Sequence, residues 1–137
     1  MKLIYPAIFT PYDDEGKQGY VVVFPDLPGC STGADSLEKA LEMAEDAASG
    51  WLLTSIEDGE AIPPASRIQD IHPEGEGAFA NLVSLDIDAY AKQYSNKAVK
   101  KTLTIPQWLN TVAEKEGINF SGVLQQALIE RLHTSKP

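Results

Sequence analysis

A lone cysteine close to acidic residues is the first feature of this sequence that could do chemistry. Cys30 lies four residues after Asp26, in the stretch FPDLPGCSTGAD. A cysteine nucleophile needs a nearby base, usually histidine, and surroundings that lower its pKa. The only histidine in residues 1–96 is His72, in a proline-rich segment, and the carboxylates of Asp26 and Asp35 would raise the thiol pKa. We therefore expect Cys30 to be a small, partly buried apolar residue.

Metal-dependent hydrolysis by clustered carboxylates is a second possible chemistry. A nuclease of this kind needs carboxylates that converge from several elements to hold two metal ions. The candidates are Asp26, Glu42, Asp86 and Asp88. Residues 1–96, however, carry 17 acidic and 5 basic side chains, a net charge of −12, which would repel RNA. A nuclease is therefore the least favoured alternative. We expect no catalytic residue, no metal site and no cofactor.

The charge of the chain changes sign along its 137 residues. Residues 97–137 carry six basic and three acidic side chains, a net charge of +3, although the whole chain has a net charge of −9. This asymmetry favours an acidic module that faces a basic partner, followed by a basic module that faces phosphate. No apolar run approaches the roughly 20 residues of a membrane helix, and no secretory signal begins the chain. One cysteine cannot form an internal disulfide, which favours a reducing cytoplasm.

The elements that must position these residues begin with β-like runs. Residues 3–10 predict a strand, and Pro6 and Pro11 suggest that it lies at a sheet edge. Residues 13–16 read as a hairpin loop, and residues 19–24 (GYVVVF) as a second strand. The three consecutive valines favour burial of this strand on both faces.

A helix is expected to follow from Asp35 or Ser36, where Asp35 and Glu38 resemble a capping box. Its apolar stripe is Leu37, Ala40, Leu41, Ala44, Ala48, Trp51 and Leu52, and its opposite face holds Glu38, Glu42, Glu45 and Asp46. Residues 57–77 read as a loop and residues 78–85 as another strand. Asp86 or Asp88 can cap a short helix after it. We predict a module over residues 1–94 and a linker at residues 95–98.

The rest of the chain, residues 99–137, has the pattern of one strand and two helices. Pro106 suits a first helical turn, Gly117 a C-terminal glycine, and Asn119 the cap of a second helix. So small a unit cannot bury a core alone, and a lone strand needs a partner, most simply the same strand of a second chain. The sequence therefore predicts a homodimer.

This tail resembles the ribbon–helix–helix family of the Arc and MetJ type. The resemblance covers residues 99–133 and implies an antiparallel ribbon of two strands that enters the DNA major groove. By the strand alternation, the side chains that read base edges would be Lys100, Thr102 and Thr104. Asn119, Phe120 and Ser121, at the start of the second helix, would contact phosphate. Lys101 departs from the pattern, because its position is more often apolar.

The first module resembles the HicB antitoxin family. The resemblance rests on Tyr5, the acidic hairpin, GYVVVFPDLPGC, the helix start GADSLEKA and IPPAS at residues 62–66. It implies an α+β fold, with a partial ribonuclease H-like βββαβ module whose third strand lies near residues 29–33. It also implies a bacterial cytoplasmic antitoxin that binds HicA, a small basic ribonuclease that cuts mRNA with a catalytic histidine. From charge and expected exposure, the candidate toxin contacts are Asp13, Asp14, Glu15, Asp26 and the acidic face of the helix that begins at Asp35 or Ser36.

Together the two modules predict a non-enzymatic antitoxin that also represses its own operon. Residues 1–94 would bind the toxin, and residues 99–137 would dimerise and bind operator DNA, where a pair of dimers on adjacent half-sites is ordinary for ribbon–helix–helix repressors. The main alternative is a stand-alone transcriptional regulator whose first module senses something else.

Overall fold

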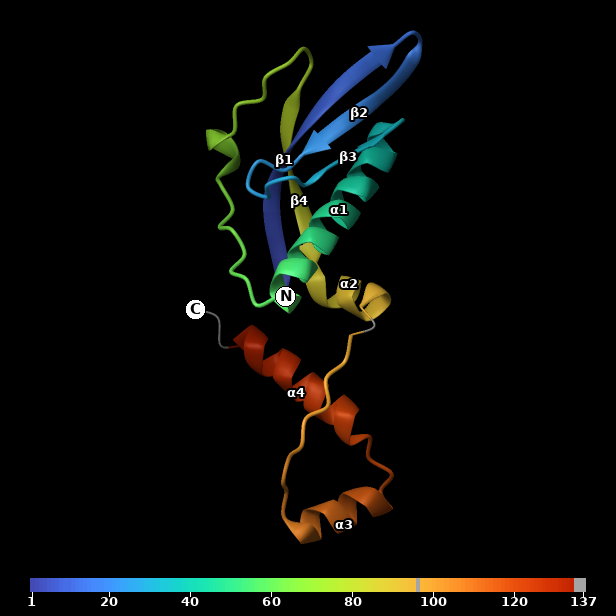
Figure 1. Ribbon diagram of the computed structural model, residues 1–137, viewed down its shortest axis with the longest axis vertical. Coiled ribbons are helices and arrows are strands. Elements are labelled where there is room, and N and C mark those ends of the chain that lie inside the picture. The colour runs from blue at the N-terminus through green and yellow to red at the C-terminus, as the bar shows by residue number, and fades with distance from the viewer. Residues whose placement is uncertain (96, 135–137) are drawn as a thin grey trace. The chain divides into compact units, whose positions relative to one another are not determined.

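The computed structural model describes residues 1–95 and 97–134, with the side chain of Thr134 excepted. Asn96, in the predicted linker, and residues 135–137, in the predicted tail module, lie outside the described residues. The chain divides after Ser95 into two compact units. The first unit contains a four-stranded antiparallel sheet and two α-helices, and the second contains two further α-helices (Figure 1). The fold is therefore α+β, as expected.

The sheet has the strand order β3-β2-β1-β4, so β1 is an inner strand and not the edge strand that its prolines suggested. β1 runs over Lys2–Asp14. Its first part pairs with β4 and its last part with β2, and only Ile8 and Phe9 pair with both neighbours. Pro6 and Pro11 each lie where one side alone is paired. A residue without an N–H group is tolerated there, because one side of the strand has no ladder to interrupt.

The hairpin between β1 and β2 is tighter than expected. β2 covers Lys17–Val23, and Asp14 pairs with Lys17, so only Glu15 and Gly16 form the turn. Both have positive φ, 52° and 86°, as a type I′ turn requires. The Gly16 N–H donates to Oδ1 of Asp13 at 3.0 Å.

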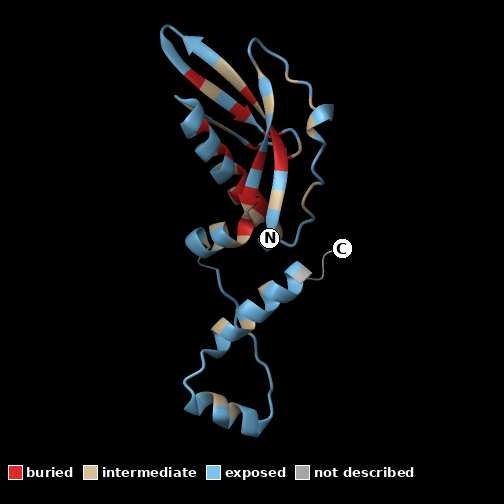
Figure 2. Cartoon of the chain, turned by 180° about the vertical axis from the view of Figure 1, so that it is seen from behind, coloured by how far each residue is buried: buried red, intermediate tan, exposed pale blue. Residues whose placement is uncertain are grey.

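The valines of β2 are buried on one face of the sheet only, which corrects the prediction of burial on both faces. Val22 is fully buried, whereas Val21 and Val23 are 43% and 42% exposed. Helix α1, Leu37–Glu57, packs against β2, β3 (Ser31–Ala34) and β4 (Phe79–Asp86). Among the residues that the structure describes, the buried ones lie in this unit, between the helix and the sheet and in the turns beside them (Figure 2).

Helix α1 begins where the sequence predicts, with one difference at its cap. Ser36 is the N-cap, and its Oγ accepts a hydrogen bond from the Lys39 N–H at 3.1 Å. Residue N3 is therefore Lys39, and the box of Asp35 and Glu38 does not form. The buried stripe is narrower than expected and consists of Ala40, Ala44, Ala48 and Leu52, with Ser49 and Ser55 beside it. Leu37 and Leu41 are 41% and 40% exposed.

A long connection, interrupted by the short 3-10 helix η1 (Ile68–Asp70), returns along the sheet from α1 to β4 (Figure 1). Asp86 then caps α2, Ile87–Tyr94, by accepting from the Ala89 N–H at 3.1 Å. Both the strand and the capped helix agree with the prediction.

Over its described residues, 97–134, the second unit has the two predicted helices but no strand. α3 covers Gln107–Lys115, directly after Pro106, and Gly117, with a φ of +67°, follows its C-cap Glu116. The N–H groups of Gly117 and Ile118 donate to carbonyls of the last helical turn, as in a Schellman motif. Asn119 caps α4, Phe120–Thr134, by accepting from the Gly122 N–H at 3.1 Å. Residues 99–105 are not a strand in the single chain.

Candidate functional site

The apolar side chains of the second unit have no core to enter. None of residues 97–133 is buried. Its large apolar side chains that remain at least 40% exposed are Val99, Leu103, Ile105, Trp108, Leu109, Val112, Ile118, Phe120, Val123, Leu128 and Leu132. The first unit, in contrast, buries fourteen hydrophobic residues. Helices with uncovered apolar faces are not independently stable in water, so this unit needs a covering partner.

The three predicted base-reading residues lie together in this unit. Lys100, Thr102 and Thr104 are all exposed, and so are the intervening residues of the segment. The segment lacks strand pairing because an isolated strand has no donor or acceptor opposite it.

The predicted phosphate contacts lie at the N-terminus of α4. Asn119 already accepts through its side chain from the Gly122 N–H and through its carbonyl from the Val123 N–H. The N–H groups of Phe120 and Ser121 belong to the first turn, which has no carbonyl acceptor within the helix. This helix terminus can therefore receive an anion.

In the first unit, the acidic residues of the hairpin form one exposed group. Asp13 and Asp14 are the last residues of β1, and Glu15 opens the turn. All three are exposed. Lys17 pairs with Asp14 across the ladder, so the hairpin tip carries one basic side chain beside three acidic ones.

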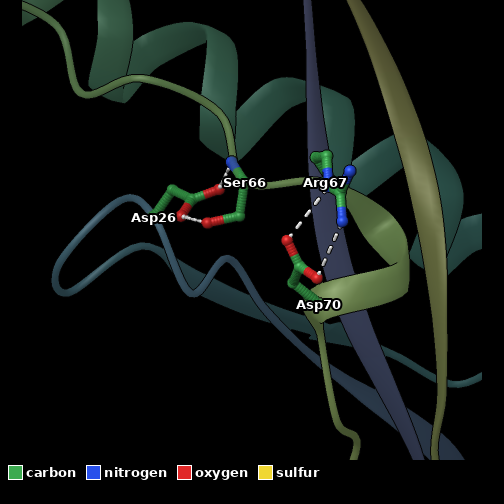
Figure 3. Close-up of polar contacts among 4 residues, drawn as sticks. All are labelled: Asp26, Ser66, Arg67 and Asp70. Carbon is green, nitrogen blue, oxygen red and sulfur yellow. Dashed lines mark hydrogen bonds and ion pairs between the residues drawn. The ribbon is translucent and has the colours of Figure 1, made fainter.

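Asp26 has a different environment from the hairpin residues, since both of its carboxylate oxygens accept hydrogen bonds from Ser66. The Ser66 N–H donates at 2.8 Å and its Oγ at 2.6 Å (Figure 3). The hydroxyl of Tyr5 also donates to the Pro63 carbonyl. The IPPAS segment is thus fixed at two points to the sheet and its β2–β3 turn. A toxin contact at Asp26 remains a prediction.

Cys30 is buried, as expected, and burial raises the pKa of its thiol. It lies in a compact turn, where its N–H donates to the Leu27 carbonyl at 2.9 Å and its carbonyl accepts from the Phe24 N–H at 3.1 Å. The Trp51 indole N–H donates to the Pro28 carbonyl at 3.1 Å and ties this turn to α1. A protonated, enclosed thiol is unsuited to nucleophilic attack.

Of the four carboxylates considered for metal binding, Glu42 and Asp86 line one hollow, but Asp26 and Asp88 do not join them there. Asp26 is hydrogen-bonded to Ser66, Asp86 caps α2, and Asp88 pairs with the amino group of Met1. Within residues 1–95 and 97–134, no three His, Cys, Asp or Glu side chains are placed to hold a metal ion. Within the same ranges, no helix is long and apolar enough to cross a membrane.

Two adjoining hollows in the first unit contain residues that the sequence did not single out. The larger one, about 590 Å³, lies between α1, α2 and the turn of Cys30, and its lining includes Asp46, Trp51, Glu60 and Tyr90. The second, about 320 Å³, shares Asp46 and Tyr90 and adds Glu45 among its lining residues. The acidic stripe of α1 was visible in the sequence, but no local pattern could show that Tyr90 and Glu60 lie beside it.

The sequence and the fold both match known proteins. Residues 5–128 match the family described as HicB_like antitoxin of bacterial toxin-antitoxin system. The chain is 31% identical to Antitoxin HicB 2 of Photorhabdus laumondii, over 79% of this chain and 76% of that protein. It is 30% identical to a 14.9 kDa protein of Haemophilus phage HP1, over 78% of this chain and 76% of that one.

Two solved structures share the fold over nearly the whole chain. One is a toxin–antitoxin complex from Streptococcus pneumoniae, with a TM-score of 0.62 and 28% identity, covering 96% of this chain and 99% of that chain. The other is the Burkholderia pseudomallei antitoxin HicB, with a TM-score of 0.52 and 26% identity, covering 95% and 98%. The chain therefore belongs to the HicB-like antitoxin family, whose members are antitoxins and not enzymes.

Proposed function

We propose that this protein binds and inhibits a HicA-type mRNA-cleaving toxin through residues 1–94 and represses its own operon through residues 99–137. Membership of the HicB-like antitoxin family supports the antitoxin role. The solved neighbour from Streptococcus pneumoniae is a toxin–antitoxin complex. A net charge of −12 on residues 1–96 suits a small basic ribonuclease, since opposite charges accelerate encounter and favour binding to a surface that receives RNA.

The main support for a dimer is that none of residues 97–133 is buried in the single chain. Val99, Leu103 and Ile105 lie at alternating positions before α3, interrupted by Lys101, and α3 and α4 add further uncovered apolar faces. If two copies pair their 99–105 segments as antiparallel strands, each segment gains ladder hydrogen bonds and both sets of apolar faces become covered. A homodimer with a two-fold axis provides both the ladder hydrogen bonds and the cover for the apolar faces through one interface.

The alternation of the same segment supports DNA binding. In a paired strand, Lys100, Thr102 and Thr104 would face away from Leu103 and Ile105, and therefore away from the dimer core. Lysine can donate to guanine O6 and N7, and threonine can hydrogen-bond a base and place its methyl group against thymine. The helix terminus at Phe120 and Ser121, with the capping Asn119, offers N–H groups to a phosphate.

A stand-alone regulator is the second candidate function, and the same tail favours it as strongly as it favours the antitoxin. The two are separated by co-expression. The test pairs this chain with the neighbouring gene that encodes a short, basic, histidine-containing protein. We expect that protein alone to stop bacterial growth and the pair to grow. If no such gene adjoins this one, or if co-expression leaves growth arrested, the antitoxin–HicA proposal fails and the regulator stands.

A further inference from the structure

The two hollows beside α1 combine carboxylates with aromatic walls. The larger hollow is lined by Asp46 and Glu60 together with Trp51 and Tyr90. The smaller one continues past Asp46 and Tyr90 to Glu45. We call these five residues and the two hollows they line the α1–α2 groove. Within the part of the chain that the structure describes, no lysine, arginine or histidine lines either hollow.

The carboxylates of the α1–α2 groove are available to an outside partner. Within the described residues, the side-chain carboxylates of Glu45, Asp46 and Glu60 make no hydrogen bond or ion pair, although the Glu60 backbone N–H donates to the Ser55 carbonyl, and all three residues are exposed. Two other carboxylates that line the smaller hollow have partners within the chain: Glu42 lies 3.5 Å from Lys39 Nζ, and Asp86 caps α2. Asp46 also acts on its neighbour, because its charge adds to burial in raising the pKa of Tyr90.

The aromatic walls are held in place by specific packing. Gly50 lies inside α1, where glycine costs about 1 kcal/mol relative to alanine. A Cβ at this position would lie 3.0 Å from the Tyr90 hydroxyl, so the missing side chain lets Tyr90 lie across the helix. Tyr90 also packs on Tyr94, with ring centroids 4.6 Å apart, and Trp51 is fixed by its hydrogen bond to the Pro28 carbonyl.

We propose that the α1–α2 groove is the docking site for an arginine side chain of the basic toxin. Arginine matches the chemistry, since its planar guanidinium binds carboxylates in a bidentate manner and stacks on aromatic faces. The occupant must carry positive charge, because Glu45, Asp46 and Glu60 have no ion pair and, among the described residues, no basic side chain lines either hollow. The inference rests on the proposed function and narrows it to one surface.

The hairpin offers a rival surface of the same general kind, and the groove proposal replaces the expectation from the sequence that Asp13 contacts the toxin. A hollow of about 400 Å³ there is lined by Tyr12, Asp13, Tyr20 and Glu76. The adjacent Lys17 lowers its attraction for a cation, and the Asp13 carboxylate is already used by the Gly16 N–H. This hollow provides a matched control, because two carboxylates can be neutralised there as in the groove.

The test uses the full chain and the HicA-type protein encoded beside it, with the catalytic histidine of that protein replaced by alanine. Affinity is measured by isothermal titration calorimetry for the wild type, for Asp46→Asn/Glu60→Gln and for Asp13→Asn/Glu76→Gln. Both variants remove two negative charges. Circular dichroism melting establishes that each variant is folded. We expect the groove variant to bind at least about tenfold more weakly and the hairpin variant to bind within about threefold of wild type.

The possible results distinguish a failure of the groove proposal from a failure of the proposed antitoxin function. Equal weakening by both variants would mean that only net charge matters, and loss confined to the hairpin variant would place the contact there; either result overturns the inference and leaves the antitoxin function intact. If the wild type does not bind the HicA-type protein at all, the proposed function itself fails, and the inference falls with it.

Discussion

Asp26 and Ser66, forty residues apart in the chain, are joined by two hydrogen bonds of 2.8 and 2.6 Å. They connect the β2–β3 turn to the connection between α1 and β4. Hydrogen bonds to a charged group contribute about 1.5–3 kcal/mol each when buried, and less at a partly exposed site such as this one. The pair therefore holds the longest irregular segment of the first unit in place.

Replacing Asp26 by alanine should lower the free energy of unfolding by about 1–2 kcal/mol, measured by urea denaturation. Asp70→Ala is the matched control, since it removes a carboxylate whose ion pair with Arg67, at 3.2 Å, is fully on the surface (Figure 3). Such pairs contribute about 0–1 kcal/mol. Equal losses from the two substitutions would contradict the role assigned to Asp26.

Glu15 is the one described non-glycine residue with positive φ, and it should be replaceable with a gain in stability. Asparagine tolerates this conformation and favours the type I′ turn before Gly16, so Glu15→Asn should raise the free energy of unfolding by about 0.5–1 kcal/mol. Glu15→Gln removes the same charge without that backbone preference. A thermal melt in which both variants behave alike would show that charge, and not backbone strain, is responsible.

Cys30 should react slowly in the folded protein. Burial raises the pKa of the thiol, so the thiolate fraction near pH 8 is smaller than in the unfolded chain, and the buried sulfur is also less accessible. The rate of alkylation by iodoacetamide is measured by mass spectrometry. We expect it to be at least about tenfold slower in buffer than in concentrated urea. Similar rates in both solvents would mean that the turn around Cys30 is open.

Dimerisation should depend on the apolar side of the 99–105 segment. Leu103→Asp places a charge in the proposed dimer core twice, once per copy. Burial of each leucine side chain contributes about 1.5–3 kcal/mol, and the dimer loses two such contributions. Its dissociation constant should therefore rise at least about 100-fold. Thr102→Asp adds the same charge on the opposite side and should remain dimeric in analytical ultracentrifugation. A monomeric wild type, or equal effects of both substitutions, would refute the dimer proposal.

Local signals in the sequence were enough to locate most elements. The caps formed by Asp86 and Asn119 could be predicted because each depends on a side chain that bonds within three residues of itself. For α1 the sequence left Asp35 and Ser36 as alternatives, and the cap is Ser36, without the predicted box of Asp35 and Glu38. The end of α3 before Gly117 could also be predicted, because the hydrogen bonds that end the helix are local. The acidic hairpin and the small residue at Cys30 also followed from local composition.

Features set by distant parts of the chain could not be predicted in this way. Pro6 and Pro11 suggested an edge strand, because the sequence does not reveal that β1 is paired on alternate sides along its length. The valines of β2 gave no sign that only one face would be covered. The Asp26–Ser66 pair and the position of Tyr90 over Gly50 arise only from tertiary packing.

The central claim is that toxin neutralisation and operator binding belong to separate parts of one chain. The most direct measurement compares wild type with Lys100→Ala/Thr102→Ala/Thr104→Ala in two assays on the same protein: binding to the DNA upstream of its own operon, and affinity for the HicA-type toxin. We predict that operator binding is lost while toxin affinity and the dimer are unchanged, because these side chains face away from the proposed dimer core. Retained operator binding, or loss of both activities together, would contradict the account.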